Sequence, residues 1–410
     1  MVDTDTSTVM NHPNNSMICT DLPADMLEAV VTKLPTVDLL SASCVSHGWL
    51  HAVRSSLHTQ PRLFPWLILR CLPHPVATTH WIHALDPHSR TWLSVPPHYN
   101  STGKAKEPSP TLNFLHGSTR DRLYALTLSQ LLISEDPFGC SCQMEAKGPN
   151  VWRQDPVVAE VQGQWVVVVG GGFLTDEREE EGAVEVHDKQ TGMWELAEPM
   201  PAEFDRSTYA TWLSVAVSEK RLFVIEKKTG WVSRFDPESK KWGPTCQLGT
   251  VPSVSKWAIV MAGKERLLLV GAGAEGEMPT SEMKVRAWEV DGDSLQVINN
   301  KAMEMPAEMV DRLFPNFDSL DEARRQVCSV EVCGTEHGGY MFDPASMKNG
   351  VVMYQFQQSM EDQETGRVEM RWEWVPSPES VGRGLKESVA VGELKSGAAR
   401  HTVQRGILAV

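Results

Sequence analysis

The glycine run at residues 170–172 is the first feature whose residue types suggest chemistry. It follows a run of valines, and a glycine-rich loop after a buried strand can bind phosphate through its backbone N–H groups. A phosphate loop also needs a following helix whose positive end faces the anion. Here the next residues are FLTDEREEEG, which are strongly acidic and show no apolar helical period. We therefore expect no phosphate site and assign Gly170 and Gly171 a structural role.

The eight cysteines are a second set of side chains that could act as metal ligands or nucleophiles. They form no CxxC pair and have no spacing typical of a zinc site. They stand at residues 19, 44, 71, 140, 142, 246, 328 and 333. We expect free, mostly buried thiols in a reducing compartment, and we predict neither a metal site nor a cofactor.

The acidic balance of the chain argues against some classes of partner. Its 410 residues carry 53 acidic side chains against 38 lysines and arginines, a net charge of −15. Nucleic-acid binding needs concentrated positive charge, so we expect no nucleic-acid partner. No apolar run is long enough to span a membrane, so no membrane association is expected either. Residues 1–18 are polar and unlike a signal peptide, which predicts a disordered leader and a cytoplasmic or nuclear protein.

A repeated pattern of aspartate and tryptophan points to the elements that build most of the chain. The segments LDPHSRTW, HDKQTGMW and FDPESKKW each place Asp six residues before Trp, as Asp86 and Trp92, Asp188 and Trp194, and Asp236 and Trp242. Weaker copies place Asp136 and Glu289 in the acidic position, with Cys142 and Leu295 where Trp would stand. The five acids are separated by 50, 52, 48 and 53 residues, and a sixth unit ends near residues 371–378. Short β-rich runs between glycines and prolines indicate about four strands per unit.

Each unit resembles a kelch repeat, because glycines at the end of a strand are followed by Asp and then by Trp. The resemblance implies a mainly β protein, with a β-propeller of about six blades over residues 64–410. Asp would cap a turn, and Trp would fill the wedge between neighbouring sheets. We expect residues 302–327 to form one or two inserted helices. The first unit is short by one strand, and we expect the tail at residues 401–410 to supply it, because a ring closes by joining its ends.

The apolar pattern near the N-terminus is helical. Leu27, Val31 and Leu34 fall on one face of a helix that Asp21 could cap and Pro35 would end. A second short helix is expected near residue 37 and a third after residues 45–46. Three helices this short and this apolar cannot bury all their apolar faces among themselves, so they need a further partner.

The order Leu-Pro, apolar helix, Leu-Pro, Asp-Leu-Leu and Cys-Val-Ser-x-x-Trp over residues 19–63 resembles an F-box. The resemblance implies a plant-type F-box/kelch-repeat protein, which binds the adaptor of an SCF-type cullin–RING ubiquitin ligase and presents a protein substrate, metabolic enzymes among them. It implies no catalysis by this chain. The adaptor-binding residues would be Leu22, Pro23, Leu27, Val31, Leu34, Pro35, Leu39, Leu40, Val45 and Trp49. One departure is Gly48, which should weaken the third helix by about 1 kcal/mol relative to Ala.

Two acidic segments occupy corresponding places in different repeats. Residues 175–181 and 273–282 each follow a glycine-rich strand, and residues 359–369 are a candidate third. An acidic rim would favour a substrate with a basic patch. The candidate substrate-binding residues are Asp176, Glu177, Glu179, Glu180, Glu181, Glu275 and Glu277. The alternative is that these are ordinary solvated loops.

The sequence is compatible with three rival interpretations. A kelch propeller can be a scaffold or cytoskeletal binding protein without ligase function, and the N-terminal helices can be a cap on the propeller edge. A propeller oxidase would need tyrosine and histidine ligands for copper in one pocket, and the chain has five tyrosines and no evident signal peptide. The helical module favours the ligase interpretation, because a pure scaffold has no need of it.

Overall fold

In the computed structural model the chain divides into two compact units, Met1–Arg62 and Leu63–Val410. The leader expected at residues 1–18 lies outside the described residues. The structure describes residues 22–36, 38–59, 64–72, 81–95, 115–117, 123–126, 129–134, 143–153, 155–171, 182–204, 208–249, 251, 253–276, 282–298, 301–315, 317, 328–358, 368–378 and 386–392.

The N-terminal unit contains three helices among its described residues, α1 (Ala24–Lys33), α2 (Asp38–Ser43) and α3 (His47–Thr59). Their apolar spacing buries one face of each helix against the others. The buried side chains of this small core are Leu27, Val31, Leu39, Ala42, Ala52 and Val53. Three helices were expected here, close to these bounds.

The helix ends in this unit follow from its prolines and one serine. Pro23 occupies the N-cap of α1 without a side-chain hydrogen bond, and Asp21, expected to cap it, lies outside the described residues. Leu34 is extended, as a residue before proline prefers, and so ends α1. The Ser46 hydroxyl accepts a hydrogen bond of 3.3 Å from the Trp49 N–H in the first turn of α3.

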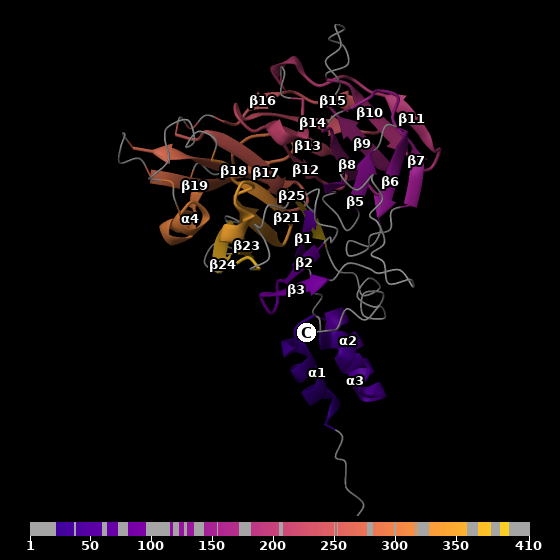
Figure 1. Ribbon diagram of the computed structural model, residues 1–410, viewed down its shortest axis with the longest axis vertical. Coiled ribbons are helices and arrows are strands. Elements are labelled where there is room, and N and C mark those ends of the chain that lie inside the picture. Colours follow the sequence, from indigo (N-terminus) through magenta and orange to yellow (C-terminus); the bar gives the residue numbers. More distant parts are fainter. Residues whose placement is uncertain are drawn as a thin grey trace, which may run out of the picture. The chain divides into compact units, whose positions relative to one another are not determined.

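The C-terminal unit is built from antiparallel strands, which pair into six sheets among the described residues (Figure 1). The first sheet has the order β25 (Lys386–Gly392), β1 (Trp66–Leu72), β2 (Trp81–Asp86) and β3 (Thr91–Val95). The second sheet runs β4 (Leu115–Gly117), β5 (Leu123–Leu126), β6 (Gln130–Ser134) and β7 (Gln143–Lys147). The third runs β8 (Val157–Val161), β9 (Trp165–Val169), β10 (Val184–Asp188) and β11 (Met193–Leu196).

The remaining three sheets repeat this arrangement. The fourth runs β12 (Leu213–Val217), β13 (Leu222–Glu226), β14 (Trp231–Asp236) and β15 (Lys241–Trp242), with β16 (Cys246–Gln247) also on β14. The fifth runs β17 (Lys256–Met261), β18 (Arg266–Glu275), β19 (Glu282–Asp291) and β20 (Met303–Glu304). The sixth runs β21 (Glu331–Thr335), β22 (Gly338–Phe342), β23 (Val351–Gln358) and β24 (Val368–Val375).

The first strand of each sheet contacts the first strand of the next, and the contacts return to their start. The cyclic order is β25, β4, β8, β12, β17, β21 and again β25. The β-propeller expected from the repeats is therefore confirmed, and each sheet is one blade. The C-terminal strand that completes the first blade comes from Lys386–Gly392, not from residues 401–410, which lie outside the described residues.

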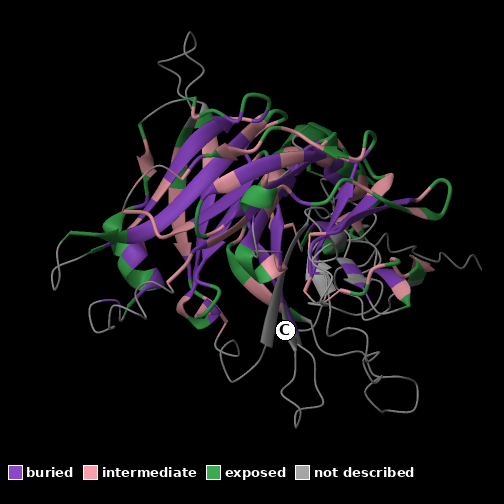
Figure 2. Cartoon of the chain, turned by 90° about the horizontal axis from the view of Figure 1, so that it is seen from above, coloured by how far each residue is buried: buried purple, intermediate pink, exposed green. Residues whose placement is uncertain are grey.

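The hydrophobic cores of this unit lie between neighbouring blades. One cluster joins Val167 and Val186 of the third blade to Leu222 and Val224 of the fourth. Corresponding clusters join the second blade to the third, the fourth to the fifth, the fifth to the sixth and the sixth to the first. Figure 2 shows the buried residues concentrated in the strands and the exposed ones in loops.

Because each blade is a meander of four strands, its connections divide between two faces of the ring. The turns between first and second strands, and between third and fourth strands, share one face, here called the aspartate face. The loops that lead into each first strand, and the turns between second and third strands, share the opposite face. It is here called the tryptophan face after Trp152 and Trp212, which lie in two of these loops and are not the repeat tryptophans. Backbone hydrogen bonds support this division. The Lys189 N–H donates to the Gln164 carbonyl on the aspartate face, and the Lys227 N–H donates to the Trp212 carbonyl on the tryptophan face.

The insertion expected at residues 302–327 contains one described helix, α4 (Ala307–Leu313). It lies between β20 and β21, and its buried Val310 and Leu313 join the core of the fifth and sixth blades. Residues 318–327 lie outside the described residues. None of the helices in the described ranges is long and apolar enough to cross a membrane.

Candidate functional site

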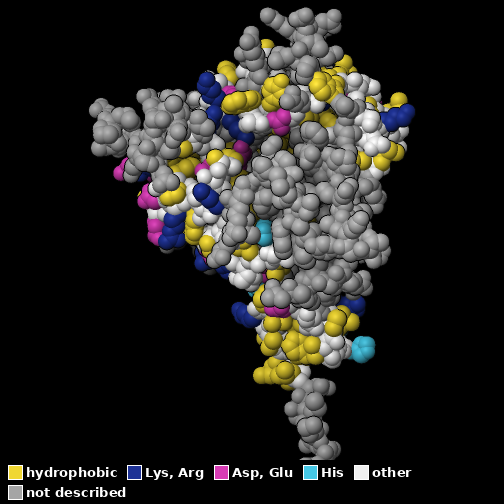
Figure 3. Space-filling model, in the orientation of Figure 1, with side chains coloured by type: hydrophobic (Ala, Val, Ile, Leu, Met, Phe, Trp, Pro, Cys, Tyr) yellow, Lys and Arg dark blue, Asp and Glu magenta, His cyan; other side chains and the backbone are white. Residues whose placement is uncertain are grey.

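The N-terminal unit exposes a set of large apolar side chains. Leu22, Met26 and Val30 are 49%, 54% and 41% exposed, and Val45, between α2 and α3, is 64% exposed. Their spacing of four residues places Met26 and Val30 on one side of α1, away from the buried Leu27 and Val31. Figure 3 shows hydrophobic side chains gathered on the surface of this unit. Such a patch on a small unit is typical of a protein-binding surface.

The structure divides the predicted adaptor-binding residues into two groups. Leu22, Pro23 and Val45 are exposed and can contact a partner directly. The others hold the helices together: Leu27, Val31 and Leu39 are buried, and Leu34, Pro35 and Trp49 are half-buried. The Leu40 side chain lies outside the described part of the structure. Sequence reasoning missed Met26 and Val30, although their spacing from Leu22 could have indicated them.

In the propeller, the repeat aspartates cap the turns on the aspartate face. Asp86 Oδ1 accepts the His88 N–H at 3.0 Å. Asp188 Oδ1 accepts the Gln190 N–H at 2.9 Å, and Asp236 Oδ1 accepts that of Glu238 at the same distance. Four residues after each Asp the backbone has a positive φ, at Arg90, Gly192 and Lys240. The three repeats therefore share one turn, as the expected capping role requires.

The acidic position of the fifth blade was predicted wrongly. Glu289 is buried within β19, and the turn is capped by Asp291, whose Oδ1 accepts the Ser294 N–H at 2.7 Å. Leu295, expected in the Trp position, has the positive φ of the turn. Val297 bridges Val290, as Trp242 pairs with Phe235 in the fourth blade, so it occupies the Trp position instead.

In three of the blades, the repeat tryptophan binds its blade to the one before it. Trp92 Nε1 donates to the Pro376 carbonyl at 2.7 Å. Trp194 Nε1 donates to the Lys147 carbonyl at 2.7 Å, and Trp242 Nε1 to that of Glu198 at 3.1 Å. All three rings are half-buried. They contribute both packing and one hydrogen bond at the outer edge of each wedge.

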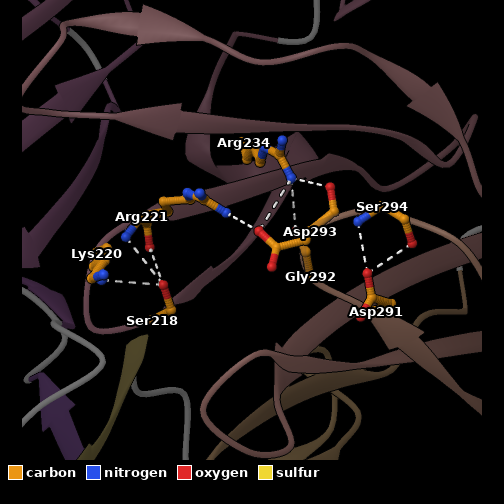
Figure 4. Close-up of polar contacts among 8 residues, drawn as sticks. All are labelled: Ser218, Lys220, Arg221, Arg234, Asp291, Gly292, Asp293 and Ser294. Carbon is orange, nitrogen blue, oxygen red and sulfur yellow. Dashed lines mark hydrogen bonds and ion pairs between the residues drawn. The ribbon is translucent and has the colours of Figure 1, made fainter.

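A similar role is filled on the aspartate face by charged groups between the fourth and fifth blades (Figure 4). Arg221 and Arg234 of the fourth blade both contact Asp293 of the fifth. Arg234 also donates to the Gly292 carbonyl at 3.2 Å. The Ser218 hydroxyl accepts the Arg221 N–H at 3.1 Å and so shapes the turn that carries Arg221. These charges serve contacts within the ring.

Gly170 and Gly171 shape the backbone where β9 leaves its sheet. Both have a positive φ, +64° and +67°. A Cβ on Gly170 would lie 2.0 Å from the Thr208 carbonyl oxygen, so a larger residue does not fit. Arg153 Nη1 donates to the carbonyls of Gly170 and Ala183, each at 2.7 Å, and its Nη2 pairs with Glu185 at 2.9 Å in a fully buried ion pair. The glycines thus serve packing between blades.

Most of the predicted substrate-binding acids lie outside the described residues. These are Asp176, Glu177, Glu179, Glu180, Glu181 and Glu277. The strands that flank the two segments, β9 and β10 and β18 and β19, are second and third strands of their blades, so both connections belong to the tryptophan face. Residues 359–369 instead connect the third and fourth strands of the sixth blade and belong to the aspartate face. They are therefore no third copy.

Glu275 is the one predicted substrate-binding acid with a described environment. Its carboxylate pairs with Arg286 on the neighbouring strand at 2.5 Å. That hydrogen bond lowers the pKa of Glu275. Glu282 and Glu304 both lie 3.5 Å from Lys284, so this end of the fifth blade is a mixed network of charges. It offers less net negative charge than the sequence alone indicates.

The described cysteines are less buried than expected. Cys44 is exposed, and Cys246, Cys328 and Cys333 are half-buried. Burial of the sulfur raises the pKa of the Cys333 thiol, which makes it a poor nucleophile. In the described part of the chain no group of three or more His, Cys, Asp or Glu side chains is placed to hold a metal ion.

Two solved structures that comparison finds are distant from this chain in sequence. A protein from Lactobacillus plantarum has a TM-score of 0.40 and 12% identity, covering 81% of this chain and 100% of its own. A fungal alcohol oxidase in complex with copper has a TM-score of 0.34 and 11% identity, covering 77% and 74%. Similarity at this level carries no argument about activity.

Comparison at the level of sequence is more informative. The F-box domain family matches residues 19–59, the segment that forms the helical unit. An F-box/kelch-repeat protein of Arabidopsis thaliana is 32% identical over 298 residues, which cover 71% of this chain and 72% of that protein. The helical unit, the repeated turns and tryptophans of the propeller and this relative agree: the chain belongs to the F-box/kelch-repeat family.

Proposed function

We propose that the chain is a substrate-recognition subunit of an SCF-type ubiquitin ligase. Membership of the F-box/kelch-repeat family supports a substrate-adaptor role of this general kind. In the proposal the helical unit binds the ligase adaptor, and through it a cullin. The propeller captures one or more target proteins for ubiquitination and degradation. The chain positions the target and contributes no catalytic step of its own.

The exposed apolar stripe on α1 is the observation that carries this proposal. α1 buries Leu27 and Val31 inside its unit and leaves Met26 and Val30 in water. Fully burying a side chain of this size contributes about 1.5–3 kcal/mol, so a partner that covers the stripe gains several such increments. A helix that is apolar on two sides suits a helix-lined groove on a partner.

A single pair of substitutions tests adaptor binding. Met26→Glu with Val30→Glu places two carboxylates in the stripe and leaves the internal core of the unit untouched. We expect about a hundredfold loss of affinity for the purified ligase adaptor, measured by calorimetry, because the charges would be buried without partners. Thr32→Glu is the control, since it adds a carboxylate on the opposite side of α1 and should change affinity by less than about twofold.

The same measurement separates the ligase from the scaffold interpretation. A scaffold or cytoskeletal propeller does not bind the ligase adaptor. Full-length protein that fails to bind the adaptor would refute the proposed function. Equal binding by the variant with Met26→Glu and Val30→Glu would refute the stripe on α1 as the adaptor-binding surface.

A further inference from the structure

The tryptophan face exposes two aromatic rings. Of the tryptophans whose side chains the structure describes, only Trp152 and Trp212 are exposed, each 46%. Trp152 lies in the loop that leads into β8, and Trp212 ends the short 3₁₀ helix Ala210–Trp212 before β12. Exposed tryptophan is costly in water and is enriched among residues that dominate protein–protein binding.

The backbone that carries these rings is held firmly. Asp155, three residues after Trp152, accepts the Thr211 N–H at 3.0 Å and its hydroxyl at 2.6 Å. The Ala210 N–H donates to the Asp155 carbonyl at 2.7 Å, and the Lys227 N–H donates to that of Trp212 at 2.9 Å. A side chain presented from a fixed backbone loses little entropy on binding. Trp212 is therefore well placed as an anchor.

Lysines surround this anchor. Lys256, at the start of β17, places its Nζ 5.5 Å from the centre of the Trp212 ring. Lys227 donates to the Thr211 carbonyl and pairs with Glu331 of the sixth blade. Lys228 is exposed. Neither Lys228 nor Lys256 forms an ion pair with a carboxylate of the described ranges.

Lysines and carboxylates are balanced in number around Trp212. Burial lowers the pKa of Lys256, and the neighbouring Lys228 and Lys227 lower it further, while Glu226 raises it. The pair of Lys227 with Glu331 is neutral overall. The carboxylates of Glu226 and Asp155 accept backbone N–H groups, so Lys228 and Lys256 are left available to pair with a ligand. Two lysines without an ion-pair partner among the described residues, beside an exposed aromatic ring, can bind carboxylates of a ligand.

We propose that Trp152, Trp212, Lys228 and Lys256, here called the tryptophan–lysine surface, bind an acidic segment of the target protein that also carries an apolar side chain. The apolar side chain packs on Trp212, and flanking carboxylates pair with Lys228 and Lys256. This inference rests on the proposed function, because it names the class of target that the propeller captures. It places the binding centre on the face to which the two acidic segments also belong.

The acidic segments offer the competing prediction of a basic target. Residues 175–181 and 273–282 connect strands on this same face, and they would attract lysine and arginine. The described surroundings of Trp212 favour the acidic target, because lysines stand beside the exposed ring. The sign of the charge on the bound segment therefore decides between the two.

A displayed library of short random peptides, selected on the purified full-length protein in complex with the ligase adaptor, tests the sign directly. We expect enriched sequences to combine Asp or Glu with an aromatic or aliphatic residue. A synthetic, labelled copy of the most enriched peptide should bind about tenfold more weakly to Lys228→Glu with Lys256→Glu, and to Trp212→Ala, in fluorescence anisotropy. Its affinity should also fall as salt rises.

The matched control changes the same charge on the aspartate face. Lys220 and Lys241 are exposed and have no ion-pair partner among the described side chains, so Lys220→Glu with Lys241→Glu should leave peptide affinity within about twofold. Enrichment of Lys- and Arg-rich peptides, no enrichment, or equal loss in this control would each overturn the inference. Adaptor affinity is measured separately in every variant. A loss of adaptor affinity would count against the proposed function. A loss of peptide binding alone would not count against the proposed function.

Discussion

The residue before the turn aspartate is Leu85, His187 or Phe235 in three of the blades, and all three are buried. The His187 ring lies 5.1 Å from that of Trp194, and Phe235 lies at the same distance from Trp242. An imidazole therefore occupies a core position that an apolar ring fills in the next blade. Neither of its nitrogens has a partner in good hydrogen-bond geometry among the described residues, and the Gly192 backbone offers only a weak contact. Such burial of polar atoms costs about 1–3 kcal/mol.

His187→Phe is expected to raise the free energy of unfolding of the propeller by about 1–2 kcal/mol near neutral pH. Burial lowers the pKa of His187 below 6.5, although Glu145 and Asp188 act in the opposite direction. Below pH 6.5 the unfolded chain therefore binds a proton that the folded chain refuses, and stability falls as the pH falls. The variant should lose this part of the pH dependence, which denaturant unfolding from about pH 7 to about pH 5 measures.

His83 should preserve part of the pH dependence of stability in the His187→Phe variant. It is buried, and burial lowers its pKa as well, so the variant should keep a smaller dependence of the same sign. A variant that is less stable than the natural protein and equally sensitive to pH would contradict the prediction. That result would mean that His187 is charged, or well bonded, in the folded chain.

The repeat register could be predicted from the sequence only where the aspartate was unambiguous. Asp86, Asp188 and Asp236 each have a tryptophan six residues later, and all three cap their turns. In the fifth blade Glu289 and Asp291 compete, and no tryptophan follows. The structure settles the choice, because the Asp291 carboxylate accepts the Ser294 N–H of the turn. Glu289 is buried in the strand instead.

At the scale of single elements, the buried side of α1 could not be predicted from the sequence. Its apolar residues cover two sides of the helix, so periodicity predicts the helix correctly and does not say which side is buried. Leu27 and Val31 are buried because α2 and α3 pack there, and Met26 and Val30 are not covered. That choice depends on tertiary contacts, which a pattern of residue types does not contain.

Gly48 in the first turn of α3 gives a prediction for this element. It is exposed, and the nearest atom to a Cβ placed there would be Leu27 Cδ1 at 3.7 Å, an ordinary van der Waals contact. Gly48→Ala should therefore stabilise the helical unit by about 0.5 kcal/mol, through a smaller loss of backbone entropy on folding. Hydrogen exchange should show about twofold greater protection of the α3 amides. Reduced protection would mean that the glycine is needed for a conformation or contact that alanine prevents.

At the scale of the whole molecule, the ring depends on a pairing between segments more than 300 residues apart. β25 pairs with β1 over seven registered positions, from Trp66 with Gly392 to Leu72 with Lys386. The need for a closing strand could be predicted from the short first repeat. Its identity could not, because both LKESVAVGEL and the last ten residues contain apolar stretches, and only the completed ring decides which one pairs.

Two truncations of the full-length protein test this closure. A chain that ends at Gly392 keeps β25, so we expect it to unfold cooperatively within a few degrees of the full-length protein. A chain that ends at Ser377 lacks β25 and leaves β1 as an exposed edge beside the first strands of the second and sixth blades. It should lose cooperative unfolding of the propeller and aggregate, because an unpaired hydrophobic edge strand recruits other chains. Calorimetry and light scattering measure the two effects.

The two chains also separate the two possible closing segments. Leu67 and Leu69 of β1 are fully buried, and the strand that flanks them on the inner side belongs to Lys386–Gly392. Were residues 401–410 the closing strand, both truncations would open the ring and both would aggregate. Normal folding of the chain that ends at Ser377 would show instead that the remaining blades close without β25. Only cooperative unfolding of the longer chain together with failure of the shorter one fits closure by β25.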